Sequence, residues 1–421
     1  MTDLIHPDAA TPTLRNRTVS RITDAEVYVA STCFKTGPPA LLGIELEWIL
    51  HHSRCPSAAI EPADLVAALG PHTPTSLSPD SPHRPLPRGS TVTVEPGGQI
   101  ELSTQPHPGL AECMAATTAD ADHLLGLLRD AGLEPSPSAT DRHRSPRRIL
   151  RQPRYAAMNK HFDTFGDDGV GGMCATAAVQ ICVDTGLNAR ERWWLLHLIG
   201  PPLIAAFANS PRLAGADTGW KSTRRKLWTG ADPGRTGLPD FDLDPARGYA
   251  HYALDAQVLC IRRDGPDWTP PSDLTFAEWI AGKHSPAPTY DDLDYHLSTL
   301  FPPVRPRGRH LEVRYLDAQP GDGWIVPLAV LSALLDDPIA ADIAAGAAES
   351  VAGLWSDAAR HGLSDPAMRT AAVAILDAAI GALRRTTSEP SVIARVEDFF
   401  QTYTVRGRSP ADDVHMLEAS Q

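Results

Sequence analysis

Two glutamates stand two residues apart in an apolar run near residue 45. The run Gly-Ile-Glu-Leu-Glu-Trp (43–48) alternates in polarity, which is typical of a half-buried strand. Because side chains alternate across a strand, Glu45 and Glu47 project from one face and their apolar neighbours from the other. Two adjacent carboxylates repel each other unless a cation lies between them. The spacing therefore indicates either a cation site or two solvated glutamates on a sheet surface.

A predicted hairpin adds two more carboxylates. Residues 91–103 contain two β-rich runs on either side of Pro96-Gly97-Gly98, which is a turn signal. Glu95 ends the first run and Glu101 lies on the second, so the turn brings both side chains near each other. Their flanking residues are apolar, which makes the glutamates the exceptional positions of this hairpin.

A third segment, residues 309–316, places Glu312 and Arg314 on one face of a strand, which alone is an ordinary ion pair. Five strand-borne glutamates in apolar surroundings suggest an oxygen-ligand site for a hard divalent cation such as Mg²⁺. No His-x-x-x-His or cysteine–histidine spacing indicates zinc. Carboxylate-bound metal ions beside an arginine are the groups that phosphoryl transfer needs, because they neutralise charge on phosphate oxygens. The residues predict such chemistry if the three segments converge.

The elements that must position these residues follow no regular strand–helix alternation. Helices are expected at 62–69, 108–131, 155–165, 188–209, 220–228 and, in alanine-rich sequence, across 324–403. Strands are expected at 41–51, in the hairpin 91–103, and at 173–184, 257–263 and 309–316. The proline-rich stretch 71–88 and the basic stretch 136–146 are expected to be loops.

Scattered strands with helices between them favour an α+β fold with an antiparallel sheet over a doubly wound fold. Neither a GxGxxG nor a GxxxxGK[ST] motif is present, so the sequence does not support a Rossmann or P-loop site. The expected organisation is a leader (1–40), a catalytic domain (41–323), a helical region packed on it (324–405) and a tail (406–421).

The composition limits the partners. Acidic residues (51) outnumber basic ones (38), the formal net charge is −13, and no basic stripe is present, so nucleic acid is not an expected partner. The six cysteines form no CxxC pair and no signal peptide precedes them, which favours a cytoplasmic protein. The apolar stretch 193–208 contains two adjacent prolines and is too short for a membrane span, so no membrane association is expected.

Several short motifs occur in order between residues 40 and 330. They are Gly-Ile-Glu-Leu-Glu (43–47), Glu-Pro-Gly-Gly-Gln-Ile-Glu (95–101), residues 173–184, Asn-Ser-Pro (209–211), Gly-Trp-Lys-Ser-Thr-Arg (219–224) with Trp228, and Leu-Glu-Val-Arg-Tyr-Leu-Asp (311–317). Together they resemble the motifs of glutamate–cysteine ligases, especially the plant-type branch and its actinobacterial relative in ergothioneine biosynthesis. The resemblance implies a glutamine-synthetase-like fold, in which an antiparallel sheet forms a funnel surrounded by helices.

The resemblance also implies a reaction and a set of site residues. ATP, with Mg²⁺ or Mn²⁺, phosphorylates the γ-carboxylate of glutamate, and the amino group of cysteine displaces the phosphate to give γ-glutamylcysteine. The implied catalytic residues are Arg314, which contacts the transferring phosphate, and Glu312. The implied metal ligands are Glu45, Glu47, Glu95, Glu101, Glu312 and Gln180, the last at a position where other branches have histidine. The implied substrate-binding residues are Arg154, Tyr155, Arg224, Arg235 and Trp228.

Other interpretations of the same residues stay open. A carboxylate–amine ligase with another amine acceptor has the same metal and phosphate strands, and a metal-dependent hydrolase would use the glutamates without ATP. Trp228 fits a packing role as well as a substrate contact, and Arg224 also fits a surface position in the basic run 224–226. A monomer is expected. Cys174 and Cys182, both placed on the strand 173–184, are expected to be buried thiols without a redox role.

Overall fold

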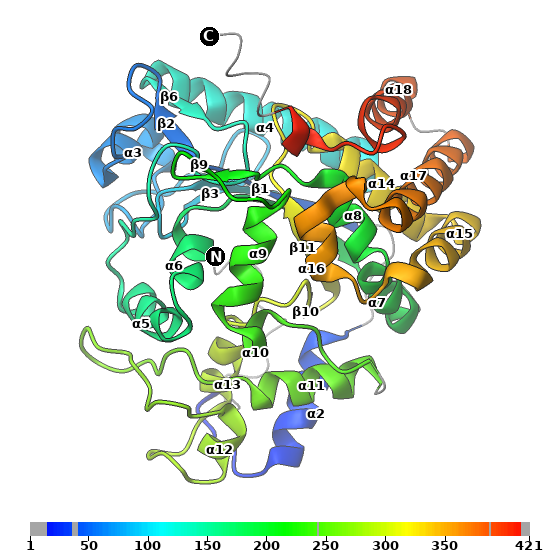
Figure 1. Cartoon of the computed structure of the whole chain (residues 1–421). Helices are drawn as coiled ribbons and strands as arrows, with labels where there is room; N and C mark the ends of the chain where they lie inside the picture. Colours follow the sequence, from blue (N-terminus) through cyan, green and yellow to red (C-terminus); the bar gives the residue numbers. More distant parts are fainter. Residues whose placement is uncertain (1–14, 36–40, 242–243, 387–388, 414–421) are drawn as a thin grey trace.

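A seven-stranded antiparallel sheet forms the centre of the protein (Figure 1). This computed structural model describes residues 15–35, 41–241, 244–386 and 389–413. The strand order is β10-β11-β7-β1-β4-β3, and β5 pairs with the start of β1, so the sheet joins segments that lie far apart in the sequence. The strands are β1 (Leu41–Trp48), β3 (Thr91–Val94), β4 (Ile100–Ser103), β5 (His107–Pro108), β7 (Ala178–Asp184), β10 (Val304–Arg307) and β11 (His310–Asp317).

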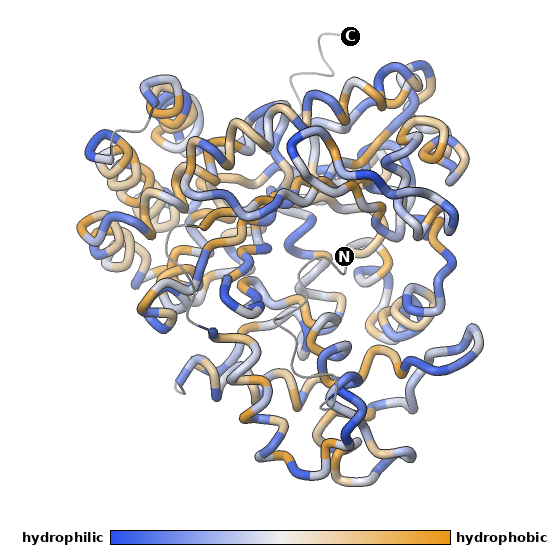
Figure 2. Tube along the Cα trace, turned by 180° about the vertical axis from the view of Figure 1, so that it is seen from behind, coloured by the Kyte–Doolittle hydropathy of each residue, from blue (hydrophilic) through white to orange (hydrophobic). Residues whose placement is uncertain are grey.

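Each central strand has an apolar and a polar face. On β1, Leu42, Ile44 and Leu46 are buried, while the side chains of Glu45 and Glu47 are only partly covered. Helix α4 (Leu110–Asp130) packs against β1 and helix α8 (Gly200–Phe207) packs against β11. Figure 2 shows the resulting hydrophobic zone, which runs through the central strands and the helices beside them. The apolar face is therefore the core, and the polar face remains for the site.

Shorter helices gather around the polar face. Helix α9 contacts both β11 and α6, and the N-terminal helix α2 packs on α11. Several of these helices begin at an Asx or Thr cap, as at Thr275 and Thr289, whose side chains accept a backbone N–H three residues on. The helices are α2 (Ile22–Cys33), α5 (Pro153–Phe162), α6 (Asp168–Cys174), α9 (Thr223–Ala231), α10 (Pro233–Thr236), α11 (Pro245–Asp255), α12 (Phe276–Ile280) and α13 (Tyr290–Leu297).

The C-terminal part is helical, as predicted. Its helices are α14 (Ile325–Asp336), α15 (Pro338–Ala348), α16 (Trp355–His361), α17 (Pro366–Arg385) and α18 (Pro390–Phe399). Two of them start at Asp-Pro pairs, in which Asp337 and Asp365 cap the helix and proline occupies its first turn. Within the described residues α17 alone is long and apolar enough to cross a membrane, yet it packs on α14, α15 and α8, as a core helix does.

The main apolar core extends from Val19 to Phe400, so the N-terminal helix and the C-terminal helices share one core with the sheet. The division at residue 323 stays a prediction. Smaller elements complete the fold: α3 (Pro62–Leu69), α7 (Ala189–Leu198), and the strand pairs β2 (Leu50–His52) with β6 (Leu133–Pro135) and β8 (Arg212–Leu213) with β9 (Ala216–Asp217).

Most predicted elements are confirmed, including the hairpin 91–103 and the antiparallel α+β class. Two strand predictions are wrong. Residues 173–174 end helix α6, so β7 begins only at Ala178, and Cys174 and Cys182 do not share a strand. Residues 257–263 form no strand; this segment makes one isolated bridge, between Gln257 and Thr275. The helix predicted at 220–228 begins at Thr223, where Ser222 caps it, and the one at 188–209 is divided at Ile199.

Candidate active site

The polar face of the sheet brings the predicted residues together. Across β1 and β4, Glu47 stands directly opposite Glu101, and across β1 and β7, Glu45 stands opposite Gln180. On the next strand, Glu312 of β11 is paired with Cys182 of β7. Directly opposed side chains of an antiparallel sheet lie on the same face, about 4.5–5.5 Å apart at Cβ. The three sequence segments therefore converge on one surface.

Two of these carboxylates are held by neighbouring donors. Glu47 accepts hydrogen bonds from the backbone N–H of Ala178 (2.8 Å) and from Gln180 Nε2 (2.6 Å). Glu101 accepts hydrogen bonds from the hydroxyls of Thr93 (2.6 Å) and Ser103 (3.2 Å). These donors fix the orientation of both carboxylates but leave their mutual repulsion in place.

The electrostatics of this face favour a bound cation. Burial and then the charges of Glu101 and Glu312 raise the pKa of Glu45. Burial, Glu101 and Glu95 raise the pKa of Glu47 in the same way. Glu45 also accepts no hydrogen bond from any described residue. Glutamates in this condition are stabilised in their charged form by a cation.

Glu95 joins the site through a turn that leaves no room for a side chain. The N–H of Gly98 donates to the carbonyl of Glu95 (2.9 Å), and Gly98 has a φ of +93°. At Gly97 an added Cβ would lie 2.0 Å from the carbonyl oxygen of Cys174, because the turn presses against the end of α6. Both glycines are required by this close approach, and Glu95 is positioned by it.

The residue that the sequence analysis missed is Arg305. It lies on β10 opposite Glu312, and its guanidinium binds the Glu312 carboxylate at 2.8–2.9 Å through Nε and Nη2. The alternation Val-Arg-Pro-Arg before Gly308 was its available signal, since it forms a hairpin with the predicted strand 309–316. On the other side, Arg314 donates to both Glu312 and Gln180. Glu312 is thus shared by two arginines.

The donor set fits a hard divalent cation by its chemistry. Glu45, Glu47, Glu95 and Glu101 supply only carboxylate oxygens, which Mg²⁺ and Mn²⁺ accept. Within the described ranges no three Asp, Glu, His or Cys side chains already enclose a metal position, so these four would draw closer around an ion. Gln180 donates to Glu47 and accepts from Arg314, which leaves it a connecting role in this arrangement.

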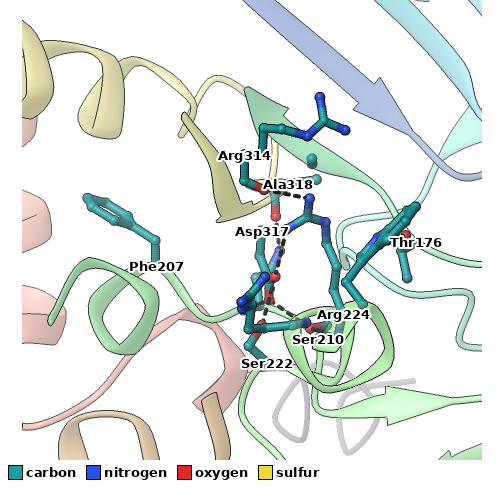
Figure 3. A network of polar contacts seen from close by, with 12 residues as sticks. Thr176, Phe207, Ser210, Ser222, Arg224, Arg314, Asp317 and Ala318 are labelled. Atoms are coloured by element: carbon teal, nitrogen blue, oxygen red, sulfur yellow. Dashed lines mark hydrogen bonds and ion pairs between the residues drawn. The ribbon is translucent and has the colours of Figure 1, made fainter. Parts of the chain in front are cut away.

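A polar network supports the far end of β11 (Figure 3). Asp317 accepts hydrogen bonds from the hydroxyls of Ser210 (2.7 Å) and Ser222 (2.9 Å). Arg224 donates from Nη2 to the carbonyl oxygen of Arg314 (2.8 Å) and is 5% exposed, with its Nε unpartnered. The alternative interpretation of Arg224 as a surface residue is therefore wrong. Burial lowers the pKa of Arg224, and the charges of Asp317 and Glu47 oppose this shift.

Two other predicted residues stand at the start of α5. Burial, and then the charge of Glu95, raises the pKa of Tyr155. The guanidinium of Arg154 lies 5.2 Å from the ring centre of Tyr295 and donates to the carbonyl of Ser298 (3.3 Å). Arg154 thus turns toward the end of α13.

The last two predicted substrate residues have structural contacts. Arg235 is fully buried and donates to Asp232, to the backbone carbonyl of Gln257 and to both the hydroxyl and the carbonyl of Thr299. In this structure these internal acceptors hold its guanidinium, and a substrate contact at Arg235 stays a prediction. Trp228 donates to the Thr176 hydroxyl (3.2 Å) and packs on Phe301 at 5.3 Å between ring centres, in agreement with a packing role.

Known proteins resemble this chain along most of its length. The chain is 38% identical to the glutamate–cysteine ligase EgtA of Mycolicibacterium smegmatis over 400 residues, covering 92% of this chain and 90% of the relative. It is 39% identical to EgtA of Mycobacterium tuberculosis over 406 residues, covering 93% and 90%. The chloroplastic glutamate–cysteine ligase of Arabidopsis thaliana is 30% identical over 246 residues, which covers 55% of this chain and 46% of that protein.

Solved structures share the fold. The glutamate–cysteine ligase of Francisella tularensis in complex with AMP has a TM-score of 0.53 at 13% identity and covers 91% of this chain and 86% of its own. A bifunctional glutathione synthetase from Pasteurella multocida has a TM-score of 0.51 at 10% identity, covering 96% of this chain and 51% of its own. The predicted glutamine-synthetase-like fold is thereby confirmed. The model of glutamate-cysteine ligase family 2 matches residues 41–420, and the chain belongs to this family.

Proposed function

We propose that this protein joins the γ-carboxylate of L-glutamate to the amino group of L-cysteine at the expense of ATP, giving γ-glutamylcysteine. One observation supports this most. A single sheet face carries opposed glutamates and Arg314, which donates to Glu312, in a chain of the glutamate–cysteine ligase family. The similarity to EgtA further supports a place for the product in ergothioneine biosynthesis.

The proposed chemistry follows from the weakness of a carboxylate as an electrophile. Transfer of the γ-phosphoryl group of ATP to glutamate gives an acyl phosphate, whose phosphate then leaves when the amine attacks. Arg314 is the proposed donor to the transferring phosphoryl oxygens, where a fixed positive charge stabilises the developing negative charge. Mg²⁺, or Mn²⁺ in its place, would be held by Glu45, Glu47, Glu95 and Glu101 and would neutralise phosphate charge.

Glu312 is proposed to bind the metal as well as Arg314, and its availability to the metal depends on where Arg314 lies. In the structure Arg314 donates to Glu312 and to Gln180. A phosphate group that draws Arg314 toward itself frees an oxygen of Glu312 for the metal, while Arg305 keeps the carboxylate in place. The Nε2 of Gln180 donates to Glu47, and its Oε1 would then accept a hydrogen bond from another donor or coordinate the metal.

Arg224, Tyr155 and Arg154 are the proposed substrate-binding residues. Arg224 carries an unpartnered Nε beside Glu47, which suits a substrate carboxylate near the metal. Trp228 is proposed as part of the wall of the site, and Arg235 as a substrate-binding residue that would have to release one of its internal acceptors. We also propose that the enzyme is a cytoplasmic monomer that binds neither nucleic acid nor membranes, in keeping with its net charge of −13.

The test is a mass-spectrometric assay with ATP, Mg²⁺, glutamate and a panel of amines that includes cysteine. We expect γ-glutamylcysteine together with equal amounts of ADP and phosphate. Arg314→Gln should lose this product, whereas Arg384→Gln, the same change at an exposed position on α17, should keep it.

Two results would contradict the proposal. A γ-glutamyl product formed only with another amine would make the protein a carboxylate–amine ligase of different acceptor specificity. No ATP turnover with any amine, together with metal-dependent hydrolysis, would favour the hydrolase. Heating in the presence of ATP separates these outcomes further, because a ligand of the native state raises the unfolding temperature.

A further inference from the structure

A cavity of about 430 Å³ lies beside the turn that follows Glu95. The backbone N–H groups of Ile149 and Leu150, which line the cavity, both donate to the carbonyl of Pro96 at 2.7 and 3.2 Å. The side chain of Ile149 also packs on Gly98. The cavity therefore shares a wall with the turn that positions Glu95, although none of the predicted site residues lines it.

The lining of this cavity is positive in a protein that is negative overall. It contains three arginines and one glutamate, whereas the whole chain carries a net charge of −13. Arg147 forms an ion pair with Glu61 at 2.8 Å, so the one negative charge of the lining is neutralised by one of the three arginines. Arg148 and Arg151 form no ion pair with any described residue. Two positive charges of the cavity remain for an anion.

Two polar atoms of the lining are buried without a hydrogen-bond partner. They are Nε of Arg148, a donor, and Oε1 of Gln152, an acceptor. The amide of Gln152 is fixed by its other atom, since Nε2 donates to the carbonyl of Ser76. Buried polar groups are normally satisfied, so each of these atoms indicates a missing partner. An occupant that meets both must offer an acceptor and a donor.

We propose that this cavity binds a small organic anion that carries a phosphate or carboxylate together with a hydroxyl or ammonium group. Arg148 and Arg151 hold the anionic group, and Gln152 accepts the hydrogen bond of the donor. Leu77 and Ile149 cover the carbon skeleton. The volume lies within the range of about 300–1,000 Å³ that is usual for small-molecule sites.

The experiment is calorimetric titration at constant ionic strength with two probes, glycerol 3-phosphate and malate. Both probes have a hydroxyl, and they differ in the anionic group, so they separate a phosphate from a carboxylate ligand. The comparison is between the parent protein, the double variant Arg148→Gln/Arg151→Gln, and Arg190→Gln as a control at an exposed arginine outside the cavity. Ser76→Phe fills the cavity without changing its charge. If the double variant does not fold, the binding of the probes to Ser76→Phe tests the proposal instead.

We expect at least one probe to distinguish the parent and Arg190→Gln from the two cavity variants. The parent and Arg190→Gln should either show one more binding site per chain than the cavity variants or bind the probe at least tenfold more tightly. An equal number of sites and equal affinity in all four proteins would overturn the proposal, as would no binding of either probe to the parent. Because binding is measured in the absence of ATP, neither result depends on the proposed ligase reaction.

Discussion

Arg305 and Glu312 form a bidentate ion pair inside the protein, with contacts of 2.8–2.9 Å between side chains that are 2% and 1% exposed. Burial raises the pKa of Glu312, but the charges of Arg305 and Arg314 outweigh this effect and hold the pKa well below its usual range. The contact of Arg305 with Glu312 fixes the carboxylate to which Arg314 donates.

Replacing Arg305 should therefore affect both stability and turnover. Removing one partner of a buried ion pair costs about 3–5 kcal/mol, so Arg305→Gln should lower the free energy of unfolding by that amount. Arg314 would then be the only arginine bound to Glu312, and both side chains would shift from their positions. This shift should reduce kcat on the order of a hundredfold. Urea unfolding and initial-rate measurements test the two effects separately.

Two further variants sharpen this test. Arg305→Lys keeps the charge but loses the two-point contact, so it should recover part of the stability and less of kcat. Arg385→Gln removes a half-exposed pair with Asp337 and should change stability far less than Arg305→Gln does. A kcat in Arg305→Gln equal to that of the parent would rule out the positioning role.

Glu101→Gln should stabilise the protein and remove its response to metal. Glu101 stands directly opposite Glu47, and like charges in such a pair destabilise a sheet. The glutamine oxygen can still accept from Thr93 and Ser103, so only the charge is lost. With chelator present, the variant should unfold at a higher temperature than the parent, whereas added Mg²⁺ should raise the unfolding temperature of the parent only. The reverse order in chelator would contradict the opposed charges.

Gly97→Ala should damage the turn that carries Glu95. The new methyl group would stand 2.0 Å from a backbone carbonyl oxygen of Cys174, which cannot move without shifting the end of α6. We expect a loss of several kcal/mol in urea unfolding. The matched control is Gly126→Ala in α4, where an added Cβ meets nothing within 4 Å. A glycine inside a helix costs about 0.5–1 kcal/mol relative to alanine, so this control should gain stability.

Two buried histidines should make the protein sensitive to acid. Burial lowers the pKa of His197 to about 4 and that of His296 to about 3. In each ring one nitrogen bonds a backbone carbonyl, of Trp193 and Ala253 respectively, and the other is buried without a partner, so a second proton has no acceptor.

In the folded protein the pKa of each histidine lies below its value of 6.5 in the unfolded chain. Between these two pH values the unfolded chain binds more protons, so the protein becomes less stable as the pH is lowered. At pH 5 each histidine should have removed about 2 kcal/mol of the stability present at pH 7. His296→Gln, whose amide can still donate to Ala253, should lose less stability between pH 7 and 5 than the parent. Unfolding curves for both proteins at several pH values provide the measurement, and parallel slopes would be evidence against a buried neutral imidazole.

The sequence alone was sufficient for β1, for the hairpin of β3 and β4, and for β11, because apolar and polar residues alternate in them. It could not reveal that residues 173–174 end a helix. Small residues such as Gly171 and Gly172 fit a close-packed helix as well as a strand, and here they allow α6 to lie against α9. At 257–263 the β-rich composition was misleading, since the segment has no strand partner beyond one bridge.

Contacts between side chains were harder to predict than elements. Arg235 was implied by the family resemblance, but its guanidinium is held by Asp232 and by acceptors from two distant segments, at Gln257 and Thr299, which no local pattern reveals. Arg305 was missed for the opposite reason. It precedes the recognised motif, and only the pairing of β10 with β11 places it against Glu312.

The division of the sheet into an apolar and a charged face also bears on how the chain finds its fold. A strand that pairs one residue out of register turns every side chain to the opposite face. For β1 such a slip would press Glu45 and Glu47 against α4 and expose Ile44 and Leu46. Burying carboxylates without partners is strongly unfavourable, so misaligned pairings are rejected. The glutamates proposed for catalysis thus also disfavour misaligned strand pairing. Apolar replacements at these positions would let misaligned chains accumulate, even where the native fold became more stable.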